Sequence, residues 1–250
     1  MFYIKSKNNY IDIHSHILPG IDDGSYSAET TAMMLSMAAD SGIRKIIATP
    51  HYKSGRKTAP PNVVKSLTEN LRNTVKALNI PIKLYSGNEI YYKQEIVDLL
   101  EKGKILTLAG SSCVLIEFAP DTHFSYIRNA VDNVKGNGYI PVIAHVERCD
   151  TLLRHMDRVE NLKRAGALMQ MNSGSIMGQS GQNVKYGCKK MLKDRLIDFV
   201  ATDAHSNMGK RIPQLHRCGA YLRLKCGDAY AERILHDNAD EIILSEVRTR

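Results

Sequence analysis

The amino-acid sequence predicts a single-domain α/β protein in which about seven parallel strands close into a distorted (β/α)7 barrel. Segments patterned as strand and helix alternate along the chain, and no internal repeat or linker divides them. A chain of 250 residues with 43% hydrophobic side chains can fill one barrel core. Repeated right-handed crossovers favour closure of the sheet. An open doubly wound sheet is the alternative, disfavoured because no G-x-G-x-x-G motif follows any strand.

The expected elements begin with a short strand at residues 10–13 and a helix at 27–39. Ser27 can cap this helix, and Gly42 follows its end. Pro61 opens a second helix, in which apolar residues recur every three or four positions. Further strands are expected at residues 45–48, 82–85, 113–118, 140–144, 167–171 and 197–201. Further helices are expected near 124–134, 152–164, 184–192 and 213–238.

The whole chain is thus expected to be one domain, with residues 1–9 as an N-terminal extension of no assigned role and 213–250 as a C-terminal helical region. The five cysteines are scattered, odd in number and free of C-x-x-C pairs, so they are interpreted as reduced core thiols. The first ten residues lack the apolar core of a signal peptide, and no segment approaches the roughly 20 apolar residues of a spanning helix. These features predict a cytoplasmic protein without membrane insertion.

The net charge of +8 favours anionic partners such as phosphates, acidic peptides or nucleic acid. Lysine and arginine are spread along the chain rather than bunched, which is typical of a solvated surface, so the charge alone does not decide among these partners.

Residues that can bind metal ions follow nearly every expected strand. In a barrel the carboxyl ends of the strands converge on one mouth, where such proteins place their active sites. Two pairs are spaced by two residues, which puts both side chains on one side of an extended segment. So many buried charges would be costly without ions. The residues at strand ends are His14, His16, His51, Glu89, Glu117, His145, Asp203 and His205, and Asp22 and Asp23 lie in the first loop.

This donor set contains nitrogen and oxygen but no thiolate, which suits Mn²⁺, Fe or Zn²⁺. It exceeds the needs of one ion, and two neighbouring ions could activate water and hold a phosphoryl oxygen. Arg148 lies three residues past His145, and Lys210 and Arg211 lie just past His205, so the same face offers cations for phosphate. No cysteine has an arginine six positions on, and G-x-S-x-G, Walker A and H-E-x-x-H motifs are absent. The sequence therefore predicts a metal-dependent phosphoesterase.

Six segments resemble, in order, the motifs of the PHP superfamily, specifically its bacterial tyrosine-phosphatase branch of the CpsB/CapC/YwqE type. The resemblance runs from about residue 10 to residue 212. The segments are IDIHSHILPGIDDG at 11–24, IATPHY at 47–52, GNEI at 87–90, LIEF at 115–118, IAHVER at 143–148 and ATDAH at 201–205.

The resemblance implies a PHP-type barrel with a centre of two to three metal ions, typically Mn²⁺. It implies a catalytic, phosphate-binding Arg148, with Lys210 or Arg211 supplying a second cation. The implied reaction is hydrolysis of phosphotyrosine on the tail of a bacterial tyrosine kinase that controls capsule or exopolysaccharide synthesis. A small-molecule phosphatase of the histidinol-phosphate type, a phosphodiesterase and a binding module with a decayed site are the alternatives. The implied metal ligands are His14, His16, Asp23, His51, Glu89, Glu117, His145, Asp203 and His205.

Overall fold

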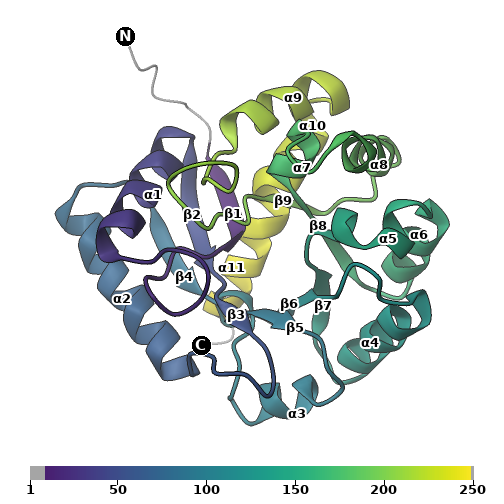
Figure 1. Cartoon of the computed structure of the whole chain (residues 1–250), viewed down its shortest axis with the longest axis horizontal. Helices are drawn as coiled ribbons and strands as arrows, with labels where there is room; N and C mark the ends of the chain where they lie inside the picture. The colour runs from purple at the N-terminus through teal and green to yellow at the C-terminus, as the bar shows by residue number, and fades with distance from the viewer. Residues whose placement is uncertain (1–8, 249–250) are drawn as a thin grey trace.

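Parallel strands occupy the centre of the molecule, and helices surround them (Figure 1). This computed structural model describes residues 9–248, so all of the predicted N-terminal extension except Asn9 lies outside the described residues. One sheet has the order β1-β2-β4 and a second the order β3-β5-β6-β7-β8-β9. The strands are β1 (Tyr10–Ser15), β2 (Ile43–Ala48), β3 (His51–Tyr52), β4 (Lys83–Ser86), β5 (Glu89–Tyr91), β6 (Cys113–Glu117), β7 (Ile140–Ile143), β8 (Leu168–Asn172) and β9 (Phe199–Ala201).

Contacts between β1 and the segment after β9 join the two sheets into a ring. A parallel bridge pairs Ser15 with Ala204, and the His16 N–H donates to the Ala204 carbonyl at 2.8 Å. The fully buried Asp12 carboxylate accepts hydrogen bonds from the backbone N–H and the hydroxyl of Thr202. Burial raises the pKa of Asp12 to about 6 despite these hydrogen bonds. The barrel predicted from the sequence is therefore confirmed.

Two of the seven expected strands are each broken into two short pieces. The pair β2 and β4 continues, after a break in each strand, as the pair β3 and β5. Pro50 lies in the first break and has no N–H for the sheet, whereas Gly87 lies in the second. A Cβ atom on Gly87 would approach side-chain carbons of Ile47 and Leu108 to 3.2 Å, so glycine avoids a tight contact at the second break. The sequence pattern did not reveal β3 and β5, because pieces of two and three residues are too short to show a periodicity.

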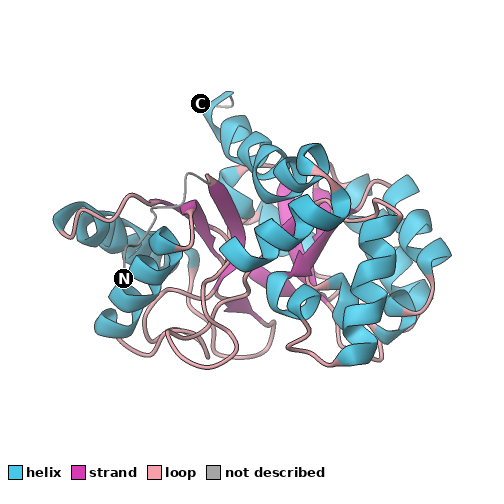
Figure 2. Cartoon of the chain, turned by 90° about the horizontal axis from the view of Figure 1, so that it is seen from above, coloured by secondary structure: helices cyan, strands magenta, loops and turns pink. Residues whose placement is uncertain are grey.

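The C-terminal helix α11 (Asn238–Arg248) completes the inner core. Its Ala239, Ile242 and Ile243 pack in one buried cluster with side chains of the strands, such as Ile11 and Val142. In Figure 1 this helix runs behind the strands, and in Figure 2 the chain ends on the side opposite the face where most loops gather. The barrel is thus filled by apolar side chains on one side, and its polar mouth lies among the loops.

The outer helices largely follow the predicted pattern, and the Ser27 hydroxyl accepts a hydrogen bond from the Thr30 N–H as the N-cap of α1. The helix expected at 152–164 is divided, because His155 has non-helical backbone angles. The helix expected at 213–238 is also divided, by Gly227 at φ 84° and by a π-helical turn at Arg233–Asp237. The helices are α1 (Ala28–Asp40), α2 (Pro61–Ala77), α3 (Ile96–Glu101), α4 (Phe124–Gly136), α5 (Asp150–Leu153), α6 (Met156–Arg164), α7 (Ser173–Met177), α8 (Gln182–Lys193), α9 (His216–Cys226) and α10 (Asp228–Glu232).

Within residues 9–248, no helix combines the length and the apolar character needed to cross a membrane.

Candidate metal centre

The barrel mouth brings together all nine side chains predicted as metal ligands. They fall into four overlapping groups, and within each group the candidate ligand atoms lie within 4.8 Å of one another. The groups are His16, Asp23, His51 and His205; His14, His16 and Glu89; His14, His145 and Asp203; and His51, Glu89 and Glu117.

Glu89 lies at the centre of this cluster and is 1% exposed. Its Oε1 lies 2.8 Å from His145 Nε2 and 3.3 Å from His14 Nε2. Its Oε2 lies 2.9 Å from His51 Nδ1 and 3.3 Å from His16 Nε2. The two oxygens thus face different histidines, which is the arrangement of a carboxylate that bridges neighbouring cations.

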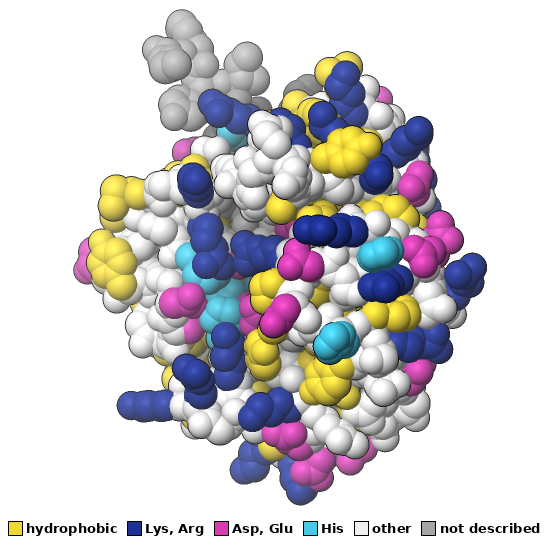
Figure 3. Space-filling view, turned by 45° about the vertical axis from the view of Figure 1, so that its right-hand side comes forward, with side chains coloured by type: hydrophobic (Ala, Val, Ile, Leu, Met, Phe, Trp, Pro, Cys, Tyr) yellow, Lys and Arg dark blue, Asp and Glu magenta, His cyan; other side chains and the backbone are white. Residues whose placement is uncertain are grey.

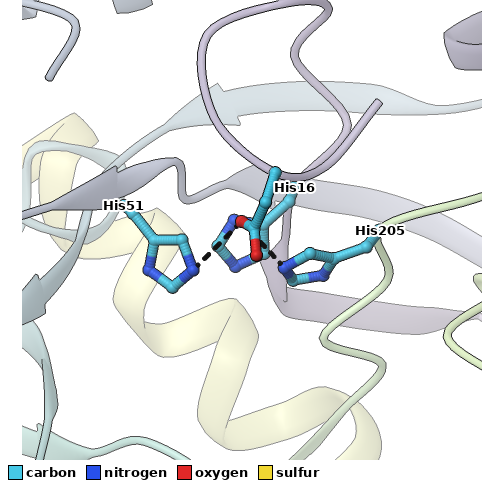
Figure 4. A group of neighbouring side chains, drawn as sticks. His16, His51 and His205 are labelled. Carbon is cyan, nitrogen blue, oxygen red and sulfur yellow. Dashed lines mark ion pairs between the residues drawn. The ribbon is translucent and has the colours of Figure 1, made fainter. Parts of the chain in front are cut away.

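Asp23 approaches the cluster from the outer side and is 65% exposed as a side chain. Its Oδ1 lies 3.3 Å from His51 Nε2 and 3.4 Å from His205 Nε2, and Figure 4 marks both contacts with dashed lines. The loop can turn back this tightly because Gly24 packs against His16, where a Cβ atom would lie only 2.2 Å from the His16 carbonyl oxygen.

Several buried polar atoms of the cluster form no hydrogen bond. They are His51 Nδ1, Glu89 Oε2, Glu117 Oε2 and His205 Nε2. His51 Nδ1 and Glu89 Oε2 are only 2.9 Å apart, yet they do not have the alignment of a hydrogen bond. Unpaired buried nitrogen and oxygen atoms are costly, and cations shared among them would remove that cost. The residues present therefore fit a divalent metal centre.

Outer hydrogen bonds fix the orientation of the histidines. The His16 Nδ1–H donates to Asp22 Oδ2 at 2.7 Å, which leaves Nε2 directed at the cluster. His14 Nδ1 lies 3.0 Å from Gln170 Oε1, and the same oxygen accepts the backbone N–H of His145 at 2.8 Å. Such partners set the tautomer and the ring orientation of a metal-binding histidine.

A chain of two side-chain amides connects His14 with Asp203. Gln170 Nε2 donates to Asn172 Oδ1 at 2.8 Å, and Asn172 Nδ2 donates to Asp203 Oδ2 at 2.8 Å. Both amide residues lie on β8 and are at most 3% exposed. No predicted ligand lies on β8 or directly after it, yet this strand orients ligands on both of its sides.

The sequence prediction missed Gln170, Asn172 and the orienting contact of Asp22. A signal for the first two exists, because Gln170 and Asn172 alternate with the buried Met169 and Met171 in one strand. Buried amides on one face of a strand indicate a polar partner across the barrel.

The charges of the cluster shift its titration strongly. Burial lowers the pKa of His16, but its hydrogen bond to Asp22 and the nearby Glu89 carboxylate raise it by more, to about 10. Burial raises the pKa of Asp22, but the same contact with His16 outweighs this and brings the value to about 2. Burial and the charge of His16 lower the pKa of His205 to about 3. Burial acts against ionisation of Glu89 and Asp203 as well, but the neighbouring histidines outweigh it and lower the pKa of both carboxylates. A cation bound here would replace the proton that His16 holds.

His145 and Asp203 have left-handed backbone angles, with φ at 33° and 51°. This conformation is unfavourable for residues with a side chain, and such strain is concentrated at functional sites. The left-handed conformation turns the backbone sharply just after β7 and after β9. As a result, the His145 side chain reaches Glu89 and the Asp203 side chain reaches His14.

Two arginines contact the cluster from one side through Asp203. Arg148 Nη2 lies 2.9 Å from Asp203 Oδ2, and Arg211 Nη2 lies 2.7 Å from Asp203 Oδ1. Both guanidinium groups are partly exposed, at 37% and 40% of the side chain. Lys210 is exposed and does not contact the cluster. Of the two candidates for the second cation, the geometry favours Arg211.

The five cysteines are free thiols, and all except Cys226 are buried. Burial raises the pKa of Cys113 to about 11 and that of Cys149 to about 12. A thiol that stays protonated at neutral pH is a poor nucleophile.

A closed (β/α)7 ring with histidines and carboxylates gathered at its mouth defines a metal-dependent hydrolase of the barrel class. The family described as "Capsular polysaccharide synthesis, CpsB/CapC" matches residues 10–244. The chain belongs to the CpsB/CapC family.

Curated relatives agree with this assignment. Tyrosine-protein phosphatase YwqE of Bacillus subtilis is 36% identical over 196 residues, which cover 78% of this chain and 77% of the relative. Tyrosine-protein phosphatase CpsB of Streptococcus pneumoniae is 31% identical over 242 residues, which cover 95% of this chain and 99% of the relative.

Solved structures show the same fold. A crystal structure from work on YwqE of Bacillus subtilis and CpsB of Streptococcus pneumoniae, described as metal-dependent tyrosine phosphatases, has a TM-score of 0.88 at 32% identity. The match covers 94% of this chain and 95% of that one. A histidinol phosphate phosphatase from Lactococcus lactis has a TM-score of 0.58 at 13% identity, covering 88% of this chain and 95% of that one, and shows the fold alone.

Proposed function

We propose that this protein is a metal-dependent protein-tyrosine phosphatase, which hydrolyses phosphotyrosine on a bacterial tyrosine kinase that regulates capsular or exopolysaccharide synthesis. The observation that carries the proposal is the cluster of nine donors with unpaired buried atoms, adjoined by two arginines on Asp203. The names of the relatives supply the phosphotyrosine substrate, and the family description supplies the link to polysaccharide synthesis.

The proposed ligands are the nine residues of the cluster, and they would hold two or three ions. Mn²⁺ is our first choice, with Fe or Zn²⁺ as alternatives for this nitrogen and oxygen donor set. When bound, such ions supply Lewis acidity for a phosphoryl oxygen and make water more acidic.

The protein's own part in the reaction is to position the phosphate and balance its charge. The planar guanidinium groups of Arg148 and Arg211 can each donate two hydrogen bonds to phosphate oxygens. Both already lie beside Asp203, so a phosphate held by them adjoins the donor cluster. Charge that develops on these oxygens during transfer would strengthen the same hydrogen bonds.

The kinase partner and the cytoplasmic location expected from the sequence are part of this proposal. The kinase tail accounts for the net charge of +8 without nucleic acid, because a phosphorylated peptide is itself an anion.

One side-by-side assay tests the proposed substrate. The Mn²⁺-loaded protein should hydrolyse a phosphotyrosine peptide with a far higher kcat/KM than histidinol phosphate or a phosphodiester oligonucleotide. A preference for histidinol phosphate would assign a small-molecule phosphatase instead, and a preference for the oligonucleotide would assign a phosphodiesterase. Absence of turnover on all three, in protein with confirmed metal content, would indicate a binding module.

A further inference from the structure

A cavity of about 500 Å³ opens beside the metal centre. Arg148 and Arg211, which contact Asp203, form part of its wall. The wall also includes Arg217 at the start of α9 and Ser175 of α7. This volume lies within the range of about 300 to 1,000 Å³ found for small-ligand pockets. It leaves room beside a phosphate for a further chemical group.

The lining of the cavity is positively charged. Four cations, Arg148, Lys210, Arg211 and Arg217, line it, and no carboxylate does. Arg148 and Arg211 are paired with Asp203, whereas Lys210 and Arg217 form no ion pair with any side chain between residues 9 and 245. Only one carboxylate, that of Asp203, balances the four cations, so the recess attracts an anion.

Buried hydroxyl groups complete the wall. Ser173 and Ser175 are 5% and 1% exposed, so the structure holds them in place. The Ser173 hydroxyl donates to the Gln214 carbonyl at 3.4 Å, and the hydroxyls of Ser175 and Ser180 are 3.0 Å apart. These hydroxyl groups make the wall polar, although Ser173 already donates its proton to Gln214.

We propose that this cavity is a second anion subsite, which binds an anionic side chain close in sequence to the phosphotyrosine of the substrate. The inference rests on the proposed function, because the cavity shares Arg148 and Arg211 with the site of the reacting phosphate. A group bound there lies close enough to that phosphate to belong to the same peptide. Lys210 and Arg217 supply the charge, and the bound group is a carboxylate or a second phosphate.

Three peptide series test this subsite with the Mn²⁺-loaded full chain. Each peptide carries one phosphotyrosine, and the residues within three positions of it contain Gln, Glu or a non-hydrolysable phosphonate analogue of phosphotyrosine. We expect kcat/KM to rise about 5- to 20-fold from the Gln series to an anionic series, mainly through KM. This gain lies between the effect expected of an exposed ion pair and that of a buried hydrogen bond to a charged group. A gain with Glu identifies carboxylates as ligands, and a gain with the phosphonate alone identifies phosphate; either supports the subsite.

Arg217→Gln should lower the ratio of kcat/KM for the anionic peptides to kcat/KM for the Gln peptides toward one. Arg164→Gln is the matched control, since Arg164 is an exposed arginine at the end of α6 and does not line the cavity. Lys210→Gln provides a second variant, so the test does not depend on Arg217→Gln alone. Thermal unfolding checks that each variant is folded.

Equal kcat/KM values for all three peptide series in the wild type would overturn the proposed subsite. An unchanged ratio in both Arg217→Gln and Lys210→Gln, or an equal fall in Arg164→Gln, would overturn it as well. No turnover of any phosphotyrosine peptide would contradict the proposed function itself, and the two failures are therefore distinguishable.

Discussion

Replacement of Gln170 by leucine should weaken metal binding although Gln170 is not itself a proposed ligand. Its Oε1 holds the His14 ring and the His145 N–H, and its Nε2 holds Asn172. Loss of such an outer partner typically costs about 10- to 100-fold in metal affinity. The variant also leaves His14 Nδ1, the His145 N–H and Asn172 Oδ1 unpaired, which at about 1–3 kcal/mol for each group destabilises the metal-free protein by about 3–9 kcal/mol.

Competition with a fluorescent chelator would give the Mn²⁺ affinity, and urea unfolding of the metal-free protein would give the free energy of unfolding. Gln170→Glu is the matched comparison, because it keeps an acceptor for His14 and the His145 N–H and replaces the donor to Asn172 by a charged oxygen. The Gln170→Glu variant should therefore retain more Mn²⁺ affinity than the Gln170→Leu variant. A leucine variant that binds Mn²⁺ as tightly as the wild type would refute the proposed role of Gln170.

Further predictions concern the metal, the arginine and the thiols. Chelation should abolish phosphatase activity and added Mn²⁺ should restore it; full activity in protein shown by elemental analysis to be metal-free would contradict this. Glu117→Gln or His145→Ala should leave a folded protein that has lost at least one ion and most turnover, as metal analysis and kinetics would show. Arg148→Ala should lower kcat about 10²- to 10³-fold, with partial recovery in Arg148→Lys; a loss under about threefold would transfer the role to Arg211. Replacement of all five cysteines by serine or alanine should keep turnover, and a folded but inactive variant would indicate a thiol nucleophile.

The sequence predicted the barrel because its regular strands carry a pattern that survives tertiary packing. The expected strands at 113–118, 140–144 and 167–171 correspond within a residue or two to β6, β7 and β8. The break of the helix at His155 was not predictable, because Leu152 and Val159 are buried on both sides of it and keep the apolar spacing intact. Buried apolar positions thus determine where an element packs, whereas its continuity depends on backbone angles that the spacing does not reveal.

The supporting residues of the site were harder to predict than the nine proposed ligands. Histidine and carboxylate residues at strand ends are conspicuous, because few other roles bring so many of them to one mouth. Gln170 and Asn172 are neutral amides in the middle and at the end of β8, and their role depends on partners on β1 and after β9. Local spacing places both amides on one face of β8, but it does not identify partners that lie 156 and 31 positions away.

The irregular parts of the barrel are the parts that assemble the site. β3 and β5 begin directly with His51 and Glu89, just past the breaks at Pro50 and Gly87. His145 and Asp203 have left-handed backbone angles at the ends of β7 and β9. In an uninterrupted strand, the position of a residue determines the face to which its side chain points. The breaks and turns re-aim these four residues toward a common centre, and the regular, apolar inner core that includes α11 supports the strained segments.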